Sequence, residues 1–104
     1  MYISCFHLPL NEVAVNRLFS DPDITILKKV YAFDKKEGMA TLVIESEDNG
    51  NSDSPPFFMK FFTLPAQENT LNEFLSVHGP GILFKEYATT LDGHVMIVIE
   101  YEKD

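Results

Sequence analysis

Apolar residues recur along this chain at two different spacings. They alternate with polar residues, or run together with β-branched and aromatic neighbours, in stretches typical of strands at 2–8, 24–33, 39–46, 57–64, 82–90 and 95–101. They return every third or fourth position at 11–19 and 71–78, which is typical of helices. The pattern predicts a single α+β domain of order βαβββαββ, with two short helices on a mostly antiparallel or mixed sheet and no internal repeat.

The clearest local pattern lies at 67–82. Thr70 and Glu73 have the spacing of a capping box, which predicts a helix from about position 71 to 78. Leu71, Phe74 and Leu75 then form one apolar stripe. Gly79 is expected to end this helix in a left-handed conformation.

The first helix is expected to begin after Asn11 as N-cap and to stop before Pro22. Its expected apolar face consists of Leu10, Val13, Ala14, Leu18 and Phe19.

The last two strands are expected to form a tight hairpin. Asp92 and Gly93 can supply the two positive φ angles of a type I′ turn. This register would place Val95, Ile97 and Ile99 on the more buried face and Glu100 on the other.

The strand at 57–64 carries apolar residues on both faces. Phe58, Phe62 and Leu64 fall on one face, and Phe57, Met59 and Phe61 fall on the other. Such a strand is either central or covered on its outer face by a helix or a partner. We therefore expect a partner-binding surface at Phe57, Met59 and Phe61.

The segment 47–56 is polar, acidic and closed by two prolines. It offers no apolar side chains to bury, so we expect a mobile acidic loop.

Charge narrows the class of partner. The formal net charge of −8 disfavours direct binding to nucleic acid or to anionic membranes. It permits attraction to a basic protein, although solubility alone also accounts for it. The sequence has no apolar run long enough to span a membrane, and its first residues, which lack a basic region, lead us to expect no signal peptide. Its one cysteine, Cys5, is expected to be a buried structural thiol. A cytoplasmic location is the natural expectation.

Candidate chemistry is sparse. His7, His78 and His94 show no zinc-ligand spacing, no serine stands in a nucleophile elbow, and Gly79-Pro80-Gly81 does not match a phosphate loop. We expect no cofactor, and the absence of a catalytic pattern leans against an enzyme without deciding the matter.

Three segments together resemble the vicinal-oxygen-chelate (glyoxalase-like) superfamily. The stretch NTLNEFLSVHGPGI at 69–82 resembles the link in which a short helix runs into a G-x-G-I strand. The strands and turn at 26–44 are compatible with the βαβββ module of that family, and DGHVMIVIE at 92–100 resembles its D-G-H-x-x-x-x-x-E ending.

The resemblance implies a metal held by His and Glu side chains. His7 matches the first-strand ligand and Glu100 matches the last-strand ligand. The histidine expected after G-x-G-I is replaced by Leu83 or Phe84, and the strand at 57–64 has no carboxylate. The implied protein is a shortened relative that has lost its metal.

Two functional hypotheses follow. The first is a small acidic non-enzymatic protein that binds or inhibits a macromolecular partner, or pairs with a second copy of itself. The second is a degenerate glyoxalase-like domain that binds a small ligand or a metal near His7, Glu100 and Glu86.

Overall fold

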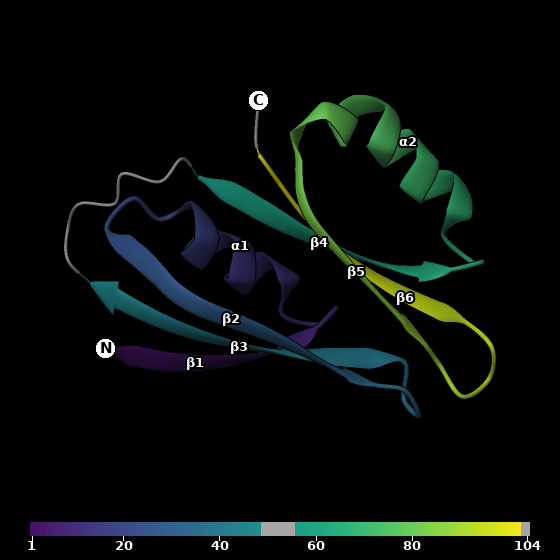
Figure 1. The fold of residues 1–104 in the computed structure, drawn as a ribbon, viewed down its shortest axis with the longest axis horizontal. Coiled ribbons are helices and arrows are strands. Elements are labelled where there is room, and N and C mark those ends of the chain that lie inside the picture. Colours follow the sequence, from purple (N-terminus) through teal and green to yellow (C-terminus); the bar gives the residue numbers. More distant parts are fainter. Residues whose placement is uncertain (49–55, 103–104) are drawn as a thin grey trace.

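The computed structural model describes residues 1–48 and 56–102 and shows two antiparallel three-stranded sheets with two helices (Figure 1). The elements are β1 (Tyr2–Leu8), α1 (Glu12–Ser20), β2 (Ile24–Asp34), β3 (Met39–Asp48), β4 (Phe57–Leu64), α2 (Glu68–His78), the 3₁₀ turn η1 (Gly79–Gly81), β5 (Ile82–Thr89) and β6 (Val95–Glu102). The first sheet has the order β1-β3-β2 and the second has the order β4-β6-β5. The predicted α+β class and the order βαβββαββ are confirmed. Most of the predicted acidic loop at 47–56 falls within residues 49–55, which lie outside the described part of the chain.

The predicted boundaries of α2 need correction. The helix begins at Glu68 after Gln67, and no side chain caps its first turn, so Thr70 and Glu73 do not form a capping box. Gly79 has right-handed angles and continues into η1. The predicted stripe is confirmed, because Leu71 is buried and Phe74 and Leu75 pack beside it.

The predicted face of α1 is right for Leu18 and Phe19 and wrong for its other members. Val15 and Phe19 are buried and Leu18 packs against the core, whereas Leu10 and Val13 are 82% and 69% exposed and Ala14 is exposed. Asn11 precedes the helix, but its side-chain oxygen accepts a hydrogen bond from the His7 backbone N–H at 3.0 Å and does not cap the helix. The helix is therefore rotated from the expected face.

The β5–β6 hairpin does not use a type I′ turn. Gly93 alone has a positive φ, of 86°, and the Thr90 N–H donates to the carbonyl of His94 at 2.8 Å. Asp92 instead accepts a hydrogen bond from the Thr90 hydroxyl. The loop is longer than predicted because these side chains stabilise a wider turn.

The chain is an internal repeat, contrary to the sequence expectation. The first repeat is β1-α1-β2-β3 and the second is β4-α2-β5-β6, and each sheet places the third strand of its repeat in the middle. Through the first three elements, equivalent residues stand 56 positions apart, as Leu8 and Leu64 do. In the last strand the spacing is 55, as for Gly38 and Gly93, because the second repeat has one residue fewer between Thr90 and Gly93 than the first has between Asp34 and Gly38.

The equivalence extends to hydrogen bonds and register. The Thr63 N–H donates to the Gln67 side chain at 2.8 Å, as the His7 N–H does to Asn11. The registers of β2 and β5 shift at equivalent positions, between Ile26 and Lys28 and between Ile82 and Phe84. Residues identical in the two repeats are Phe6/Phe62, Leu8/Leu64, Pro9/Pro65, Glu12/Glu68, Asn16/Asn72, Ser20/Ser76, Ile26/Ile82, Leu27/Leu83, Lys29/Lys85, Tyr31/Tyr87, Ala32/Ala88, Gly38/Gly93, Val43/Val98, Ile44/Ile99, Glu45/Glu100 and Glu47/Glu102.

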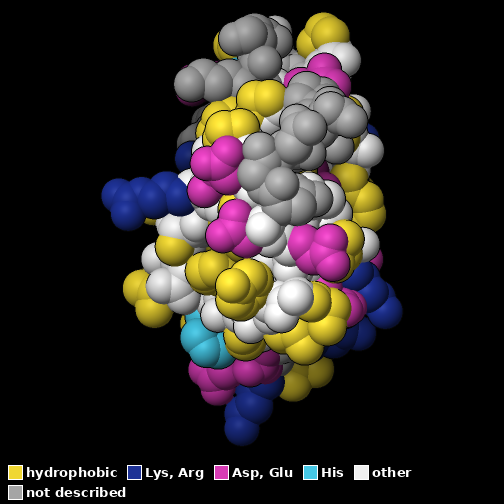
Figure 2. Space-filling model, turned by 90° about the vertical axis from the view of Figure 1, so that its left-hand side faces the viewer, with side chains coloured by type: hydrophobic (Ala, Val, Ile, Leu, Met, Phe, Trp, Pro, Cys, Tyr) yellow, Lys and Arg dark blue, Asp and Glu magenta, His cyan; other side chains and the backbone are white. Residues whose placement is uncertain are grey.

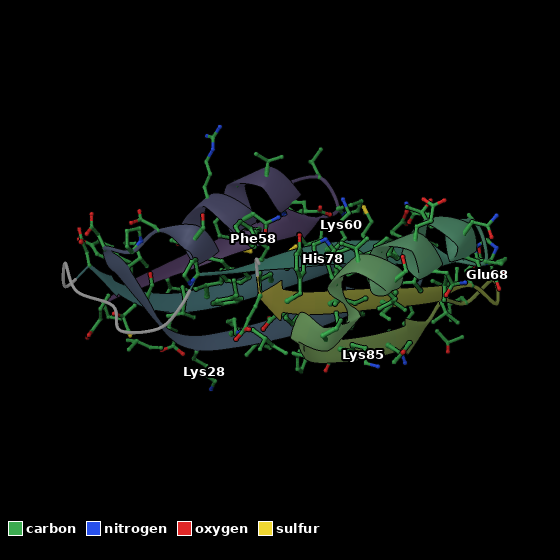
Figure 3. The ribbon with its side chains drawn as sticks, turned by 90° about the horizontal axis from the view of Figure 1, so that it is seen from above. Lys28, Phe58, Lys60, Glu68, His78 and Lys85 are labelled. Carbon is green, nitrogen blue, oxygen red and sulfur yellow. The ribbon has the colours of Figure 1, made fainter. Side chains whose placement is uncertain are left out.

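The first repeat packs against one face of the second sheet. One core cluster joins Leu8, Val15, Phe19, Ala40, Leu42 and Ile44 of the first repeat to Met59, Phe61, Met96 and Val98 of the second. A separate cluster forms where α2 covers the other face of the second sheet, with Phe62, Leu71, Ile97 and Ile99. Seen from above, α1 and α2 lie toward opposite ends of the molecule (Figure 3).

Helix α1 covers the outer edge of β4. The Asn16 side-chain amide accepts a hydrogen bond from the Met59 N–H at 2.7 Å and donates one to the Met59 carbonyl at 3.1 Å. The Phe61 N–H points to the Glu12 carboxylate at 3.4 Å, and Lys60 pairs with Glu12 at 3.5 Å. β4 is thus an edge strand. Of the predicted alternatives, the central strand is wrong and cover by a helix is confirmed, because α1 occupies backbone groups of β4 that would otherwise lack partners.

We expect the Asn16→Ala variant to lose about 1–3 kcal/mol of unfolding free energy, because two part-buried backbone groups of Met59 lose their partners. Urea denaturation measures this. The Asn69→Ala variant, altered at an exposed position of α2, is the matched control and should change stability by less than about 0.5 kcal/mol. Equal stability losses in the two variants would contradict the role given to Asn16.

Candidate functional site

A buried carboxylate lies where the two repeats meet. Glu100 on β6 is 3% exposed, although the sequence placed it on the less buried side of its strand. Ile97 and Ile99 are also buried, so the predicted alternation is right while both faces of β6 are covered. The first repeat covers the face that carries Glu100.

Two side chains of β2 satisfy this carboxylate. The Lys29 ammonium forms an ion pair with one oxygen of Glu100, and the Tyr31 hydroxyl donates to the other at 2.6 Å. A buried charge is tolerated when it is paired and hydrogen-bonded in this way. The same Lys29 ammonium lies 4.5 Å from the centre of the Phe57 ring and 5.5 Å from that of Phe19. These contacts stabilise the junction of the repeats through charge and cation–π attraction.

The surroundings of Tyr31 raise its pKa well above 10.0, the usual value for tyrosine. Burial is the largest cause, and the negative charge of Glu100 and the hydrogen bond to it add to the effect. The phenol is therefore held in its protonated form, in which it donates to Glu100.

The strand predicted to bind a partner is mostly interior. Met59 is 0% exposed, Phe61 is 5% exposed, and Phe57 is half-buried against Phe19 with ring centres 4.5 Å apart. The expectation that these three side chains form an accessible surface is wrong for Met59 and Phe61, because the first repeat covers that face of β4. The three side chains of β4 therefore do not form an accessible apolar face.

The two residues matched to metal ligands have separate partners. His7 lies exposed on β1, 3.4 Å from the Thr41 hydroxyl, and lines a pocket of about 400 Å³ with Leu10, Asp34, Met39, Ala40 and Thr41. Glu100 lies in the second sheet and is bound by Lys29 and Tyr31 of the first sheet. Over residues 1–48 and 56–102, no group of three or more His, Cys, Asp or Glu side chains could hold a metal ion.

His78 belongs to an aromatic cluster. Its ring centre lies 4.7 Å from that of Phe74 and 4.8 Å from that of Tyr101. Its Nδ1 atom is buried and has no hydrogen-bond partner among the described residues. The ring therefore packs beneath the end of α2, in addition to standing in the last helical turn as predicted.

The accessible apolar surface lies on the first sheet. The pairing register puts Ile3, Cys5, Val30, Ala32 and Val43 on one face, bordered by His7, Lys28, Thr41 and Glu45; we call this the open face. Ile3 is 66% exposed, Val30 is 47% exposed, and Cys5 is exposed, which corrects its predicted burial. At the end of the molecule where β1 begins, hydrophobic side chains reach the surface among acidic ones (Figure 2).

Sequence reasoning missed this face because it did not detect the repeat. The paired segments ILKKVYA and ILFKEYA, with LVIESE and IVIEYE, carry the evidence for it. Aligning them would have shown that Ile3 and Val43 are the counterparts of the core residues Met59 and Val98. The same alignment makes Lys85, Tyr87 and Glu45 the counterparts of Lys29, Tyr31 and Glu100.

Comparison with protein-family models, curated proteins and solved structures finds no match for this chain. No helix in the described part of the chain is long and apolar enough to cross a membrane.

Tyr31 should make stability depend on alkaline pH. Because its folded-state pKa is raised, the unfolded chain releases the phenolic proton first, and unfolding becomes easier as pH rises above about 10. Relative to wild type, Tyr31→Phe should flatten the fall in unfolding free energy between about pH 9 and 11, while Tyr2→Phe, altered at an exposed tyrosine, should keep the wild-type slope. Denaturant titrations at several pH values measure this, and identical slopes in Tyr31→Phe and wild type would contradict it.

Proposed function

We propose that this chain is a non-catalytic interaction module that binds a protein through the open face of its first sheet. The observation that carries the proposal is the exposed apolar character of that face, in contrast to the second sheet, whose central strand β6 is buried on both faces. Ile3, Val30 and Val43 are apolar neighbours on the open face, and no described element packs over Ile3 or Val30. A sheet with one bare apolar face is typical of a surface that meets another protein.

Charge supports a protein as the occupant. The net charge of −8 repels phosphate backbones and anionic lipid headgroups, and the open face itself carries both signs, with Lys28 opposite Glu45 across β2 and β3. A mixed border around an apolar centre is the usual composition of a protein–protein interface.

The glyoxalase-like alternative would place the function at His7 and Glu100. Glu100 already accepts from Lys29 and Tyr31, so a ligand there would have to displace a buried ion pair. We therefore prefer the interaction module.

The test is a charge placed on the open face. Val30→Asp should lower capture of bound proteins from native cell extract by about tenfold, because it buries an unpaired carboxylate in the interface. Val13→Asp is the matched control, since Val13 is an exposed valine of α1 away from this face, and it should capture like wild type.

Circular dichroism and the melting temperature should show both variants folded. Undiminished capture by folded Val30→Asp protein would exclude the open face as the binding surface.

A further inference from the structure

The two repeats contact each other through different faces of their sheets. Helix α1 and strand β2 of the first repeat pack on the face of the second sheet that carries Met59, Val98 and Glu100. The equivalent face of the first sheet is the open face. The equivalent packing elements, α2 and β5, contact nothing in that position within the described chain.

We propose that a second copy of this chain occupies the open face, and that α2 and β5 of each copy pack on the first sheet of the other as α1 and β2 pack on the second sheet. This rests on the proposed function and names the partner of that surface. Two copies related by a twofold axis would satisfy both open faces, since each supplies one α2–β5 unit and receives another.

Each of the three polar residues at the centre of the internal contact has an identical counterpart in the other repeat. Lys85 and Tyr87 on β5 correspond to Lys29 and Tyr31, and Glu45 on β3 corresponds to Glu100. Lys85 is exposed on the outer strand β5 (Figure 3), and Tyr87 is 58% exposed. In the second copy, Glu45 is the carboxylate that these two groups would bind.

These groups are available for that contact. Within residues 1–48 and 56–102, Lys85 and Glu45 form no ion pair, although Lys28 stands opposite Glu45 in the sheet. The three polar positions of the contact carry the same side chains in both repeats.

The residues that cover the edge of β4 also have counterparts in the second repeat. Asn16 and Glu12 cover the β4 backbone, and their counterparts Asn72 and Glu68 are identical and exposed on α2. The backbone that corresponds to Met59 is that of Ile3 on β1, the outer strand of the first sheet. Asn72 of one copy can therefore occupy the N–H and C=O of Ile3 in the other.

The apolar contact follows the same correspondence. Met59 is 0% exposed in the internal contact, whereas its counterpart Ile3 is 66% exposed. Phe19 stacks on Phe57 at the internal junction, and Leu75 and Met1 hold the equivalent positions. Burying this surface supplies the hydrophobic part of association.

A single copy cannot make the second contact. Helix α2 lies at one end of the molecule and the start of β1 lies at the other (Figure 1), and Glu68 projects at the end remote from β1 (Figure 3). The long axis of the chain measures 43 Å. The unfilled contact therefore requires a second chain.

Charge reversal tests the proposal on purified protein at about 0.15 M salt, where screening limits the general repulsion between acidic chains. By light scattering, the wild-type chain should have twice the monomer mass of 11.8 kDa. Lys85→Glu and Glu45→Lys should each raise the dimer dissociation constant about a hundredfold, because each dimer contains the like-charge contact twice. An equimolar mixture of the two variants should recover the dimer, since both contacts then join opposite charges.

The matched controls are Lys36→Glu and Glu37→Lys, which make the same charge changes at exposed positions of the β2–β3 turn. Both should remain dimeric. Melting temperatures near that of wild type should show that all four variants are folded.

A wild-type chain that stays at the monomer mass at high concentration overturns the dimer. So does a mass that grows beyond two copies, a charge variant that stays dimeric, or a mixture that fails to recover the dimer. None of these results removes the proposed interaction module if Val30→Asp lowers capture of other proteins as predicted above. Conversely, wild-type capture by Val30→Asp refutes the module itself.

Discussion

The central strand of the second sheet, β6, is buried on both faces, and the rest of the molecule is arranged around that burial. Helix α2 covers Ile97 and Ile99, while the whole first repeat covers Val98 and Glu100. Each repeat by itself is too small to bury its sheet on two sides, since about fifty residues form only one thin layer. Packing one repeat on the other provides a common core, and the Glu100 ion pair orients the two layers because it is satisfied only when Lys29 and Tyr31 both reach it.

The same unit therefore exists in two environments within one chain. Both repeats have a glutamate at the same position of the last strand. In the second repeat it is Glu100, which is buried and paired, and in the first repeat it is Glu45, which is only partly buried. The asparagine of the helix differs in the same manner, because Asn16 covers a strand edge and Asn72 is exposed. The contact of α1 and β2 with the second sheet is made within the chain. The equivalent contact, of α2 and β5 with the open face, is not made within the described residues, and the proposed dimer rests on this difference.

The polar groups of this contact also restrict what can occupy the open face. A glutamate at its border selects a cation with a hydroxyl donor nearby, and an uncovered strand edge selects a side chain that both donates and accepts. Those are the properties of Lys85, Tyr87 and Asn72. The net charge of −8, by contrast, acts over a longer range and does not select a particular partner.

Parts of the candidate site were predictable and parts were not. The three aromatic and methionine positions of β4 were recognised as needing cover, and the structure shows that the chain covers Met59 and Phe61 itself. The repeat escaped detection because its identities are scattered and its spacing changes by one residue at the second hairpin. Glu100 was placed on the exposed side because alternation along a strand cannot show whether a second layer lies over the polar face.

The sequence alone determined the six strands, the two helices, their order and the buried stripe of α2, because alternation and helical spacing are local properties of neighbouring residues. Only the tertiary structure decided which face of α1 is buried, how the helix ends are satisfied, and which turn closes the last hairpin. The face of α1 depends on contacts with distant residues, as when Asn16 binds β4. The helix ends and the turn depend on competition between nearby polar groups, as when Asn11 binds the His7 backbone and does not cap its helix, or when the Thr90 hydroxyl donates to Asp92. The division of the strands into two sheets, one with its central strand buried on both faces and one with an open face, likewise follows from packing between segments far apart in the chain, which no local pattern of residues records.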